Sequence, residues 1–145
     1  MIAICLFALH NVKAQKAEDS VKAAVNALFI AMAASDSAAI VNSFADDAVL
    51  QSINEKDGKT TVVNEKTTDF GHAIAALQKG DADERIKFNE LKVDGPLAMA
   101  WAPYNFYYKG KFSHCGVDFF GLVRKNGVWK IQYLIDTRRK DGCKN

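Results

Sequence analysis

The stretch 97–138 constrains the fold of this chain more than any other segment. Its runs of aromatic and β-branched residues are separated by short turns containing glycine, and they predict three consecutive antiparallel strands at 98–108, 112–124 and 128–137. Strands joined by tight turns pair with one another, so these residues form the centre of a sheet. The remaining segments have to cover it.

The two turns set the predicted pairing. Asn126-Gly127 suits a type I′ turn, which needs positive φ at both central positions, and Lys109-Gly110 makes a second two-residue turn. The predicted pairs are Asn105–His114, Trp101–Asp118, Met99–Phe120, Phe120–Tyr133, Asp118–Ile135 and Leu122–Ile131. One face of the sheet then holds Met99, Trp101, Asn105, His114, Asp118, Phe120, Leu122, Trp129, Ile131, Tyr133 and Ile135.

That face has the composition of a small-molecule pocket, because a carboxylate, an imidazole and an amide are set among apolar and aromatic side chains. Asp118, His114 and Asn105 are expected to orient a ligand. The ligand contacts predicted from the sequence are Trp101, Asn105, His114, Asp118, Phe120, Tyr133 and Phe44.

Asp118 and His114 each have a functional and a structural interpretation. Among apolar neighbours the pKa of Asp118 would rise, which lets the carboxyl donate a hydrogen bond or take a proton near neutral pH. Alternatively, Asp118 is a buried carboxylate satisfied by backbone amides, an Asn or an Arg. His114 is either a second catalytic group or an ordinary hydrogen-bonding histidine.

The residues before the sheet predict three helices. Residues 17–34 carry Val21, Val25, Leu28, Phe29 and Met32 at helical spacing. Ser35 or Asp36 can cap a second helix that presents Ile40, Val41 and Phe44. A third helix with Phe70, Ala73, Ile74 and Leu77 begins at Thr67 or Thr68 and is ended by Gly80.

Short strands at 48–53 and 60–63 and a longer one from Asp83 to Val93 complete the order. Segregated helices and strands of this kind indicate an α+β fold, a cone-shaped curved antiparallel sheet packed against three helices. The interior of the cone is the face described above.

Composition excludes several functional classes. A chain of 145 residues suits one domain, here 15–145, and a net charge of +2 with scattered basic residues gives no nucleic-acid footprint. The sequence has no HxxxH, HExxH or CxxC spacing and no glycine-rich phosphate loop. We therefore expect no metal, no cofactor and no nucleic-acid partner.

The first residues predict export. Residues 2–9 form a short apolar run, and Val12-Lys13-Ala14 suits cleavage after Ala14, so residues 1–14 are interpreted as a signal peptide of a secreted or periplasmic protein. The alternative is a tail or the first turns of a helix. Eight apolar residues are too few to span a bilayer, so no membrane insertion is expected after signal removal.

Cys115 and Cys143 have two interpretations. Export would leave both in an oxidising compartment, where they can pair if the tail after Thr137 folds back. Two unrelated thiols are the alternative, because distance decides whether a disulfide forms.

The opposite face of the predicted sheet is also apolar, although a solvated face should be polar. It carries Ala100, Ala102, Tyr104, Phe106, Tyr108, Cys115, Val117, Phe119 and Val123. No segment is left over to cover it, so we expect a homodimer packed through this outer face.

Two segments carry a resemblance to a known family. Residues 43–48, Ser-Phe-Ala-Asp-Asp-Ala, and residues 126–131, Asn-Gly-Val-Trp-Lys-Ile, resemble the nuclear transport factor 2-like superfamily, and more closely its small SnoaL-like and lumazine-binding-like bacterial members. The resemblance covers about 17–138 and implies a cystatin-like cone. It does not imply one reaction, because the scaffold hosts isomerases, dehydratases, cyclases and binders.

Within that resemblance, Asp118 matches the strand-borne acid of the isomerases, whereas 17–34 lack the tyrosine of their first helix. Asp118 and His114 only partly match the Asp/His pair of the dehydratases. The first hypothesis is thus an exported domain that binds a small apolar or aromatic molecule. The alternative is a cofactor-independent isomerase, dehydratase or cyclase with Asp118 and His114 as catalytic groups, and a third is a cavity filled by the protein's own side chains.

Overall fold

The computed structural model describes the backbone of residues 5–143 and the side chains of residues 15–143. The predicted signal segment, 1–14, lies outside the residues described with side chains. The elements are α1 (Cys5–Ala33), α2 (Ser37–Ser43), β1 (Phe44–Lys56), β2 (Lys59–Glu65), α3 (Thr67–Ala75), β3 (Ala82–Ile86), β4 (Glu90–Asp94), β5 (Leu97–Tyr108), β6 (Lys111–Lys125) and β7 (Val128–Arg139).

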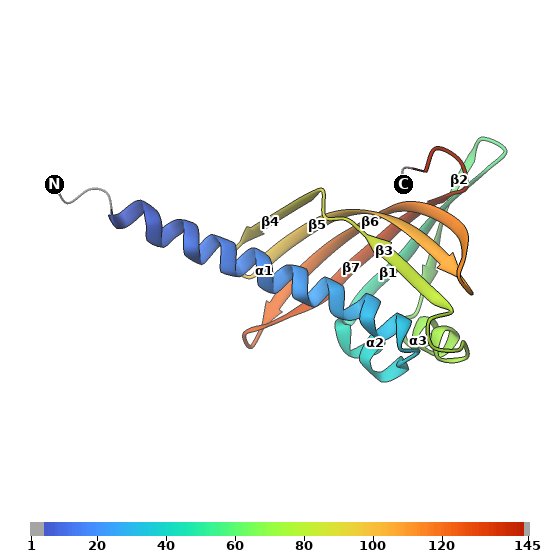
Figure 1. Cartoon of the computed structure of the whole chain (residues 1–145), viewed down its shortest axis with the longest axis horizontal. Coiled ribbons are helices and arrows are strands. Elements are labelled where there is room, and N and C mark those ends of the chain that lie inside the picture. Colours follow the sequence, from blue (N-terminus) through green and yellow to red (C-terminus); the bar gives the residue numbers. More distant parts are fainter. Residues whose placement is uncertain (1–4, 144–145) are drawn as a thin grey trace.

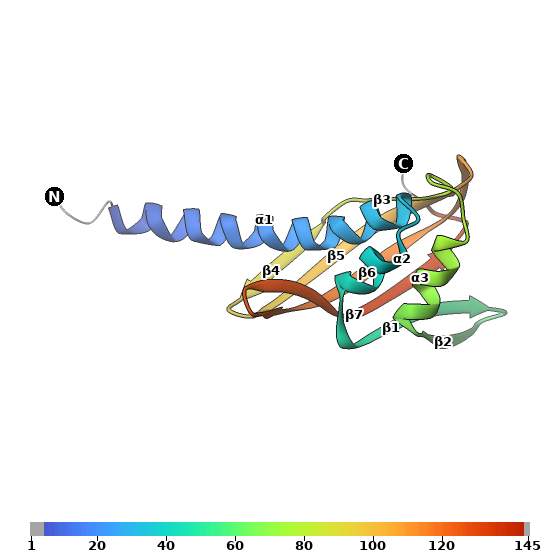
Figure 2. The same ribbon diagram turned by 90° about the horizontal axis from the view of Figure 1, so that it is seen from below.

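The described strands form one sheet in the order β2-β1-β7-β6-β5-β3, and β4 pairs with β5 beyond the end of β3. β1 and β7 are parallel, and the other pairs are antiparallel. The sheet is curved, α1 runs across its concave side, and α2 and α3 close one end (Figures 1 and 2). The α+β prediction of a curved sheet covered by three helices is confirmed.

The apolar stripe predicted for the first helix is confirmed. Val21, Val25 and Leu28 are at most 1% exposed, because residues spaced by three or four lie on one face of a helix. Phe29 meets Phe120 of β6 edge to face, with ring centroids 6.1 Å apart. The first turns of α1 extend past the sheet (Figure 1).

Asp36, not Ser35, caps α2, and its carboxylate accepts a hydrogen bond from the Ala39 amide at 3.0 Å. The predicted cap of the third helix is wrong, because the N-cap position of α3 is Lys66, which makes no side-chain cap bond. α3 also ends at Ala75, before Gly80.

The predicted turns are right, but the predicted strand registers hold only near them. Lys125 pairs with Val128 and Leu122 with Ile131, as expected; beyond a bulge at Gln132, Asp118 pairs with Asp136. A second bulge at Ser113 changes the other hairpin. The pairs there become Phe106–His114, Ala102–Asp118 and Ala100–Phe120.

Each bulge adds one residue to a strand and so exchanges its two faces beyond that point. Five residues were predicted to lie inside the cone but lie on the convex face instead: Met99, Trp101, Asn105, Tyr133 and Ile135. Trp101 is 44% exposed there, and the Tyr133 hydroxyl donates to Gln51 at 2.7 Å. Conversely, Ala100, Ala102, Tyr104 and Phe106, predicted to be outside, face the helices.

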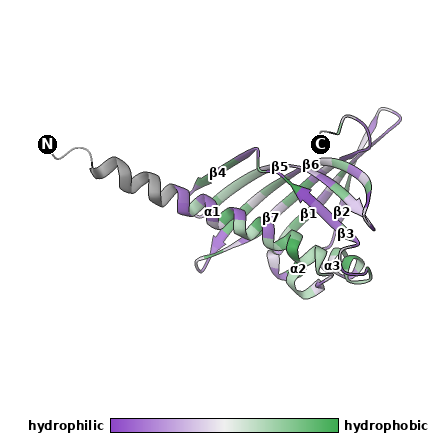
Figure 3. Cartoon of the chain, in the orientation of Figure 1, coloured by the Kyte–Doolittle hydropathy of each residue, from purple (hydrophilic) through white to green (hydrophobic). Residues whose placement is uncertain are grey.

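The hydropathy of the elements differs between the edge strand β3 and the helices that close the end of the sheet. β3 is mostly hydrophilic, whereas α2 and α3 are largely hydrophobic (Figure 3). The core includes Trp129, predicted as core filling, which is 7% exposed and donates from Nε1 to the Ser20 hydroxyl at 3.0 Å.

Cys115 and Cys143 form a disulfide, which decides between the two interpretations of these cysteines. The bond attaches the segment after β7 to β6. Of the helices within the described residues, none has the length and apolarity to cross a membrane.

Candidate functional site

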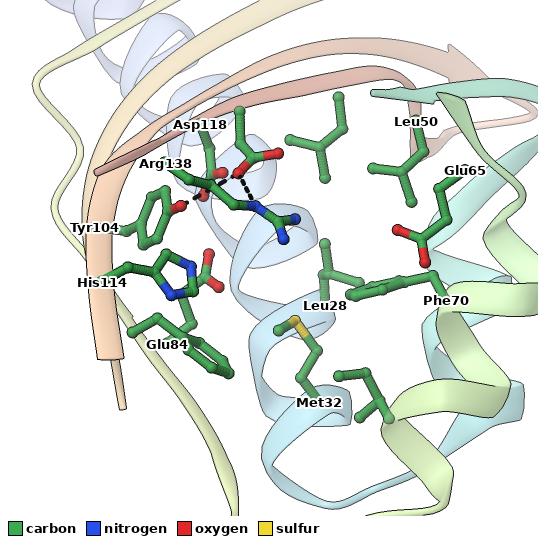
Figure 4. A pocket seen from close by; sticks show the side chains of 14 residues that line it. Leu28, Met32, Leu50, Glu65, Phe70, Glu84, Tyr104, His114, Asp118 and Arg138 are labelled. Carbon is green, nitrogen blue, oxygen red and sulfur yellow. Dashed lines mark hydrogen bonds and ion pairs between the residues drawn. The ribbon is translucent and has the colours of Figure 1, made fainter. Parts of the chain in front are cut away.

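A cavity of about 200 Å³ lies between the concave side of the sheet and the helices. It is lined by Leu28, Met32, Leu50, Glu65, Phe70, Ile74, Glu84, Tyr104, Phe106, His114, Asp118, Leu134, Asp136 and Arg138. Apolar side chains from α1 and α3 form one wall, and polar side chains from β3, β5, β6 and β7 form the opposite wall (Figure 4).

Asp136 is the fully satisfied carboxylate of this polar wall. Its Oδ2 accepts hydrogen bonds from Arg138 Nε at 2.7 Å and from the Tyr104 hydroxyl at 3.2 Å, and its Oδ1 accepts one from the Ser52 hydroxyl. Arg138 also donates to Ser52 at 2.9 Å. A buried charge paired and hydrogen-bonded in this way is a stable structural unit.

Asp118 lies beside this unit on the neighbouring strand and differs from Asp136 in one respect. It is 4% exposed, and its Oδ2 atom has no hydrogen-bond partner among the described residues. It therefore does not fit the structural interpretation, in which protein donors satisfy the whole carboxylate. The group facing it in the cavity is another carboxyl, that of Glu84 on β3 (Figure 4).

Glu84 and Asp118 lie within hydrogen-bond reach, and a bond between two carboxyls needs a proton on one of them. Burial and the Glu84 charge raise the pKa of Asp118 well above its ordinary value. Burial also raises the pKa of Glu84, to about 7, although the hydrogen bond from Asp118 opposes this shift. Both shifts favour the protonated form, so the pair retains at least one proton near neutral pH.

His114 and Tyr104 form an aromatic side of the cavity. The His114 ring stacks at a tilt on Phe106, with centroids 5.0 Å apart, and meets Tyr104 edge to face at 5.7 Å. Burial lowers the pKa of His114, with Arg138 adding to the effect. Burial and the Asp136 charge raise the pKa of Tyr104, so its hydroxyl remains a donor.

Gly116 makes this packing possible. A Cβ atom on Gly116 would lie 1.7 Å from the Thr137 carbonyl oxygen and 2.8 Å from the Tyr104 ring. The Tyr104 hydroxyl donates to that same carbonyl at 3.0 Å. The missing side chain lets β5 and β7 hold Tyr104 and Asp136 in contact across β6.

The structure brings together only two of the residues predicted from the sequence, His114 and Asp118. Neither Phe120 nor Phe44 lines this cavity. Phe120 is fully buried in the core, and Phe44, 4% exposed, lines a different groove between α2 and the β6–β7 turn. Trp101, Asn105 and Tyr133 lie on the convex face, as described above.

Sequence reasoning missed Glu84, Tyr104, Asp136 and Arg138. Tyr104 is predicted on the outer face and Asp136 on neither face, because the sequence does not indicate the two bulges. Glu84 stands between two other charged residues in Asp83-Glu84-Arg85, and its pairing with Phe106 across the sheet places it inside. The one signal in the sequence is the alternation in 82–86, which puts Glu84 on the same strand face as the apolar Ala82 and Ile86.

The arrangement can bind or move protons. Asp118 can donate a hydrogen bond, Glu84 can accept one, and Arg138 and Tyr104 fix the third carboxylate nearby. Within 15–143 the structure shows no group of three or more His, Cys, Asp or Glu side chains placed to hold a metal ion.

Several solved structures share the fold. A nuclear transport factor 2-like protein of unknown function from Shewanella baltica has a TM-score of 0.67 and 14% identity, with 87% of this chain and 96% of that one covered. A domain of unknown function with a cystatin-like fold from Nostoc punctiforme has a TM-score of 0.66 at 14% identity, covering 85% and 78%.

A third structure, described as a putative dehydratase of the nuclear transport factor 2-like family, comes from Streptomyces avermitilis. Its TM-score is 0.62 at 14% identity, with coverage of 86% and 97%. No curated protein matches this chain in sequence. Residues 16–133 match the family described as "Putative lumazine-binding". The chain therefore belongs to that family and has the nuclear transport factor 2-like fold.

Proposed function

We propose that this domain binds a small, partly aromatic molecule in the cavity between α1, α3 and the sheet. The observation that carries the proposal is Asp118, a buried carboxyl with one oxygen unpartnered in the described structure, which faces the cavity beside Glu84. An unsatisfied buried polar atom costs roughly 1–3 kcal/mol, and a ligand that hydrogen-bonds to it recovers that cost.

The dimensions and walls of the cavity support a flat ligand. Its volume of about 200 Å³ is below the roughly 300–1,000 Å³ of drug-sized sites, so one or two fused rings are the appropriate size. Phe70, Phe106 and His114 supply ring faces and edges for stacking. Lumazine, named in the family description, is a flat bicyclic molecule with N–H donors and carbonyl acceptors, and it is the first probe to use.

Filling the cavity should abolish binding. Met32 of α1 lines the cavity and is 4% exposed, so Met32→Trp is expected to occupy the ligand volume and to weaken lumazine binding by about tenfold or more, a loss of ~1.4 kcal/mol or more. A fluorescence titration of freshly purified protein with lumazine measures this, after native mass spectrometry has shown whether another molecule copurifies.

Ile30→Trp is the matched control, because Ile30 lies on the same helix but is 69% exposed. It should bind like the unmodified chain. Equal affinity of all three proteins would place binding outside this cavity and refute the proposal.

A second candidate function is proton transfer without a cofactor, as in an isomerase or dehydratase. The shared proton of Asp118 and Glu84 favours it, because a protonated carboxyl in an apolar site can polarise a carbonyl while a neighbouring carboxylate takes a proton. An Asp118→Asn variant that keeps its affinity but loses turnover would support catalysis, whereas a modest loss of affinity alone would support binding.

The protein is further proposed to be a homodimer through the convex face of the sheet. Trp101, Phe119 and Ile135 form one row across β5, β6 and β7 on that face, and an apolar face of this kind is typical of an interface. Sedimentation at micromolar concentration should show a dimer, and Trp101→Glu should give a monomer. Val62→Glu, on the exposed β1–β2 hairpin, should not; a monomeric unmodified chain would contradict the proposal.

Export is proposed as well, with cleavage after Ala14. The disulfide between Cys115 and Cys143 supports this placement, because such bonds persist mainly in oxidising compartments. Fractionation of the producing cells, with the chain expected outside the cytoplasm, tests it.

A further inference from the structure

We infer that the molecule bound in the cavity carries a flat cationic group of the amidinium type, whose two N–H donors bind the facing carboxyls of Glu84 and Asp118. This inference rests on the proposed function and specifies the ligand's chemistry. It depends on which charged groups line the cavity and on which of these groups are paired with an opposite charge from the protein.

The polar wall contains three carboxyls but only one permanently charged cation, Arg138. The guanidinium of Arg138 is bonded to Asp136 at 2.7 Å and to Ser52 at 2.9 Å, so its charge is matched by Asp136. In the described part of the chain, neither Glu84 nor Asp118 takes part in an ion pair. The negative charge that the carboxyl pair carries once Glu84 is ionised thus faces the cavity without an ion-paired cation among the described residues.

No other element that packs against the carboxyl pair supplies this cation. α1 contributes Leu28 and Met32 to the cavity, and α3 contributes Phe70 and Ile74. The remaining titratable groups around the cavity are Glu65 of β2, Tyr104 of β5, His114 of β6, and Asp136 and Arg138 of β7. Burial disfavours a charge on His114, which leaves a ligand to supply the positive charge.

The shape of the site favours a flat organic cation over a metal ion. Two carboxyls that converge from different strands can each accept one N–H of a planar fork, the geometry in which carboxylates bind guanidinium groups. Tyr104, Phe106 and His114 add aromatic faces, which attract cations. Hard metal ions instead require about six oxygen ligands, which two carboxyls do not supply.

The experiment compares three probes of nearly equal shape by calorimetric titration: benzamidinium, benzamide and benzoate. Benzamidinium should bind most tightly. Its affinity should rise with pH as the carboxyl pair loses a proton, because the pKa of Glu84 is about 7. The expected slope is about tenfold per pH unit below that pKa, with a plateau above it. Benzamide should show no such rise.

Glu84→Gln should remove both the preference for benzamidinium and the pH dependence. Asp83→Asn is the matched control, because Asp83 is the preceding residue, on the opposite face of β3, and pairs there with Arg85; it should behave as the unmodified chain does. If benzamide or benzoate binds as tightly as benzamidinium, the inference is wrong and cavity binding remains. If none of the three probes binds, the inference is also wrong, while the lumazine titration of Met32→Trp still decides the proposed function separately.

Discussion

The free energy of unfolding is expected to fall by about 2–3 kcal/mol between about pH 5 and about pH 8, the largest pH effect that this structure predicts. The cause is Glu84, whose pKa is raised from 4.5 to about 7 in the folded chain. Between these two values the folded state holds a proton that the unfolded state has released. Stability is therefore highest below the unfolded pKa and is lost as the pH rises through about 7.

Asp118 acts in the same direction, because burial also raises its pKa. His114 acts in the opposite direction: its pKa is lowered, so the unfolded chain binds the additional proton, and stability rises as the pH increases toward ~6.5, the ordinary value. The carboxyl pair gives the larger effect because the shift of Glu84 alone spans more than two pH units.

Denaturant titrations at several pH values measure the dependence. Glu84→Gln should flatten the curve and raise stability at pH 8, since the variant has no carboxylate to place beside Asp118. Asp83→Asn should leave the curve unchanged, because Asp83 is paired with Arg85 outside the cavity. An unmodified chain equally stable at both ends of the range would mean that Glu84 and Asp118 do not share a proton.

Local signals predicted the elements of this fold well. Apolar spacing in 17–34 identified the buried face of α1, and the tight turns at Lys109-Gly110 and Asn126-Gly127 lie where expected, with positive φ at all four residues. The face of Asp118 was also predicted correctly, because β6 alternates without interruption from Leu122 to Asp118. Which residues of one uninterrupted strand share a face depends only on their spacing, so the sequence is enough to predict it.

The partners of Asp118 were not predictable in the same way. The bulges at Ser113 and Gln132 shift β5 and β7 by one residue against β6, and they exchange Trp101 for Ala102 and Ile135 for Asp136 opposite Asp118. A bulge is favoured by the curvature of the whole sheet, not by one residue type. The bulge at Gln132 accounts for the charged part of the site, since it places Asp136 and Arg138 on the concave face, where Tyr133 and Ile135 were expected.

Gly116→Ala is expected to destabilise the fold by roughly 3 kcal/mol, the upper end of the usual cost of overpacking. The new methyl group would lie 1.7 Å from the Thr137 carbonyl oxygen. That oxygen belongs to the backbone of β7, so relief requires the end of β7 to move away from β6. The Tyr104 ring, 2.8 Å from the same methyl position, would have to move as well.

Because Tyr104 donates to both Asp136 and Thr137, the displacement should also disturb the polar wall and weaken ligand binding. Denaturant titration and the lumazine titration measure the two effects. Gly121→Ala is the control on the same strand: its methyl group would meet Tyr133 Cβ at 3.5 Å, an ordinary contact, so the change should stay within about 0.5 kcal/mol. If both variants unfold at the same denaturant concentration, the close packing at Gly116 does not stabilise the contact of β5 with β7. The position of the Asp136 side chain would then depend on its hydrogen bonds alone.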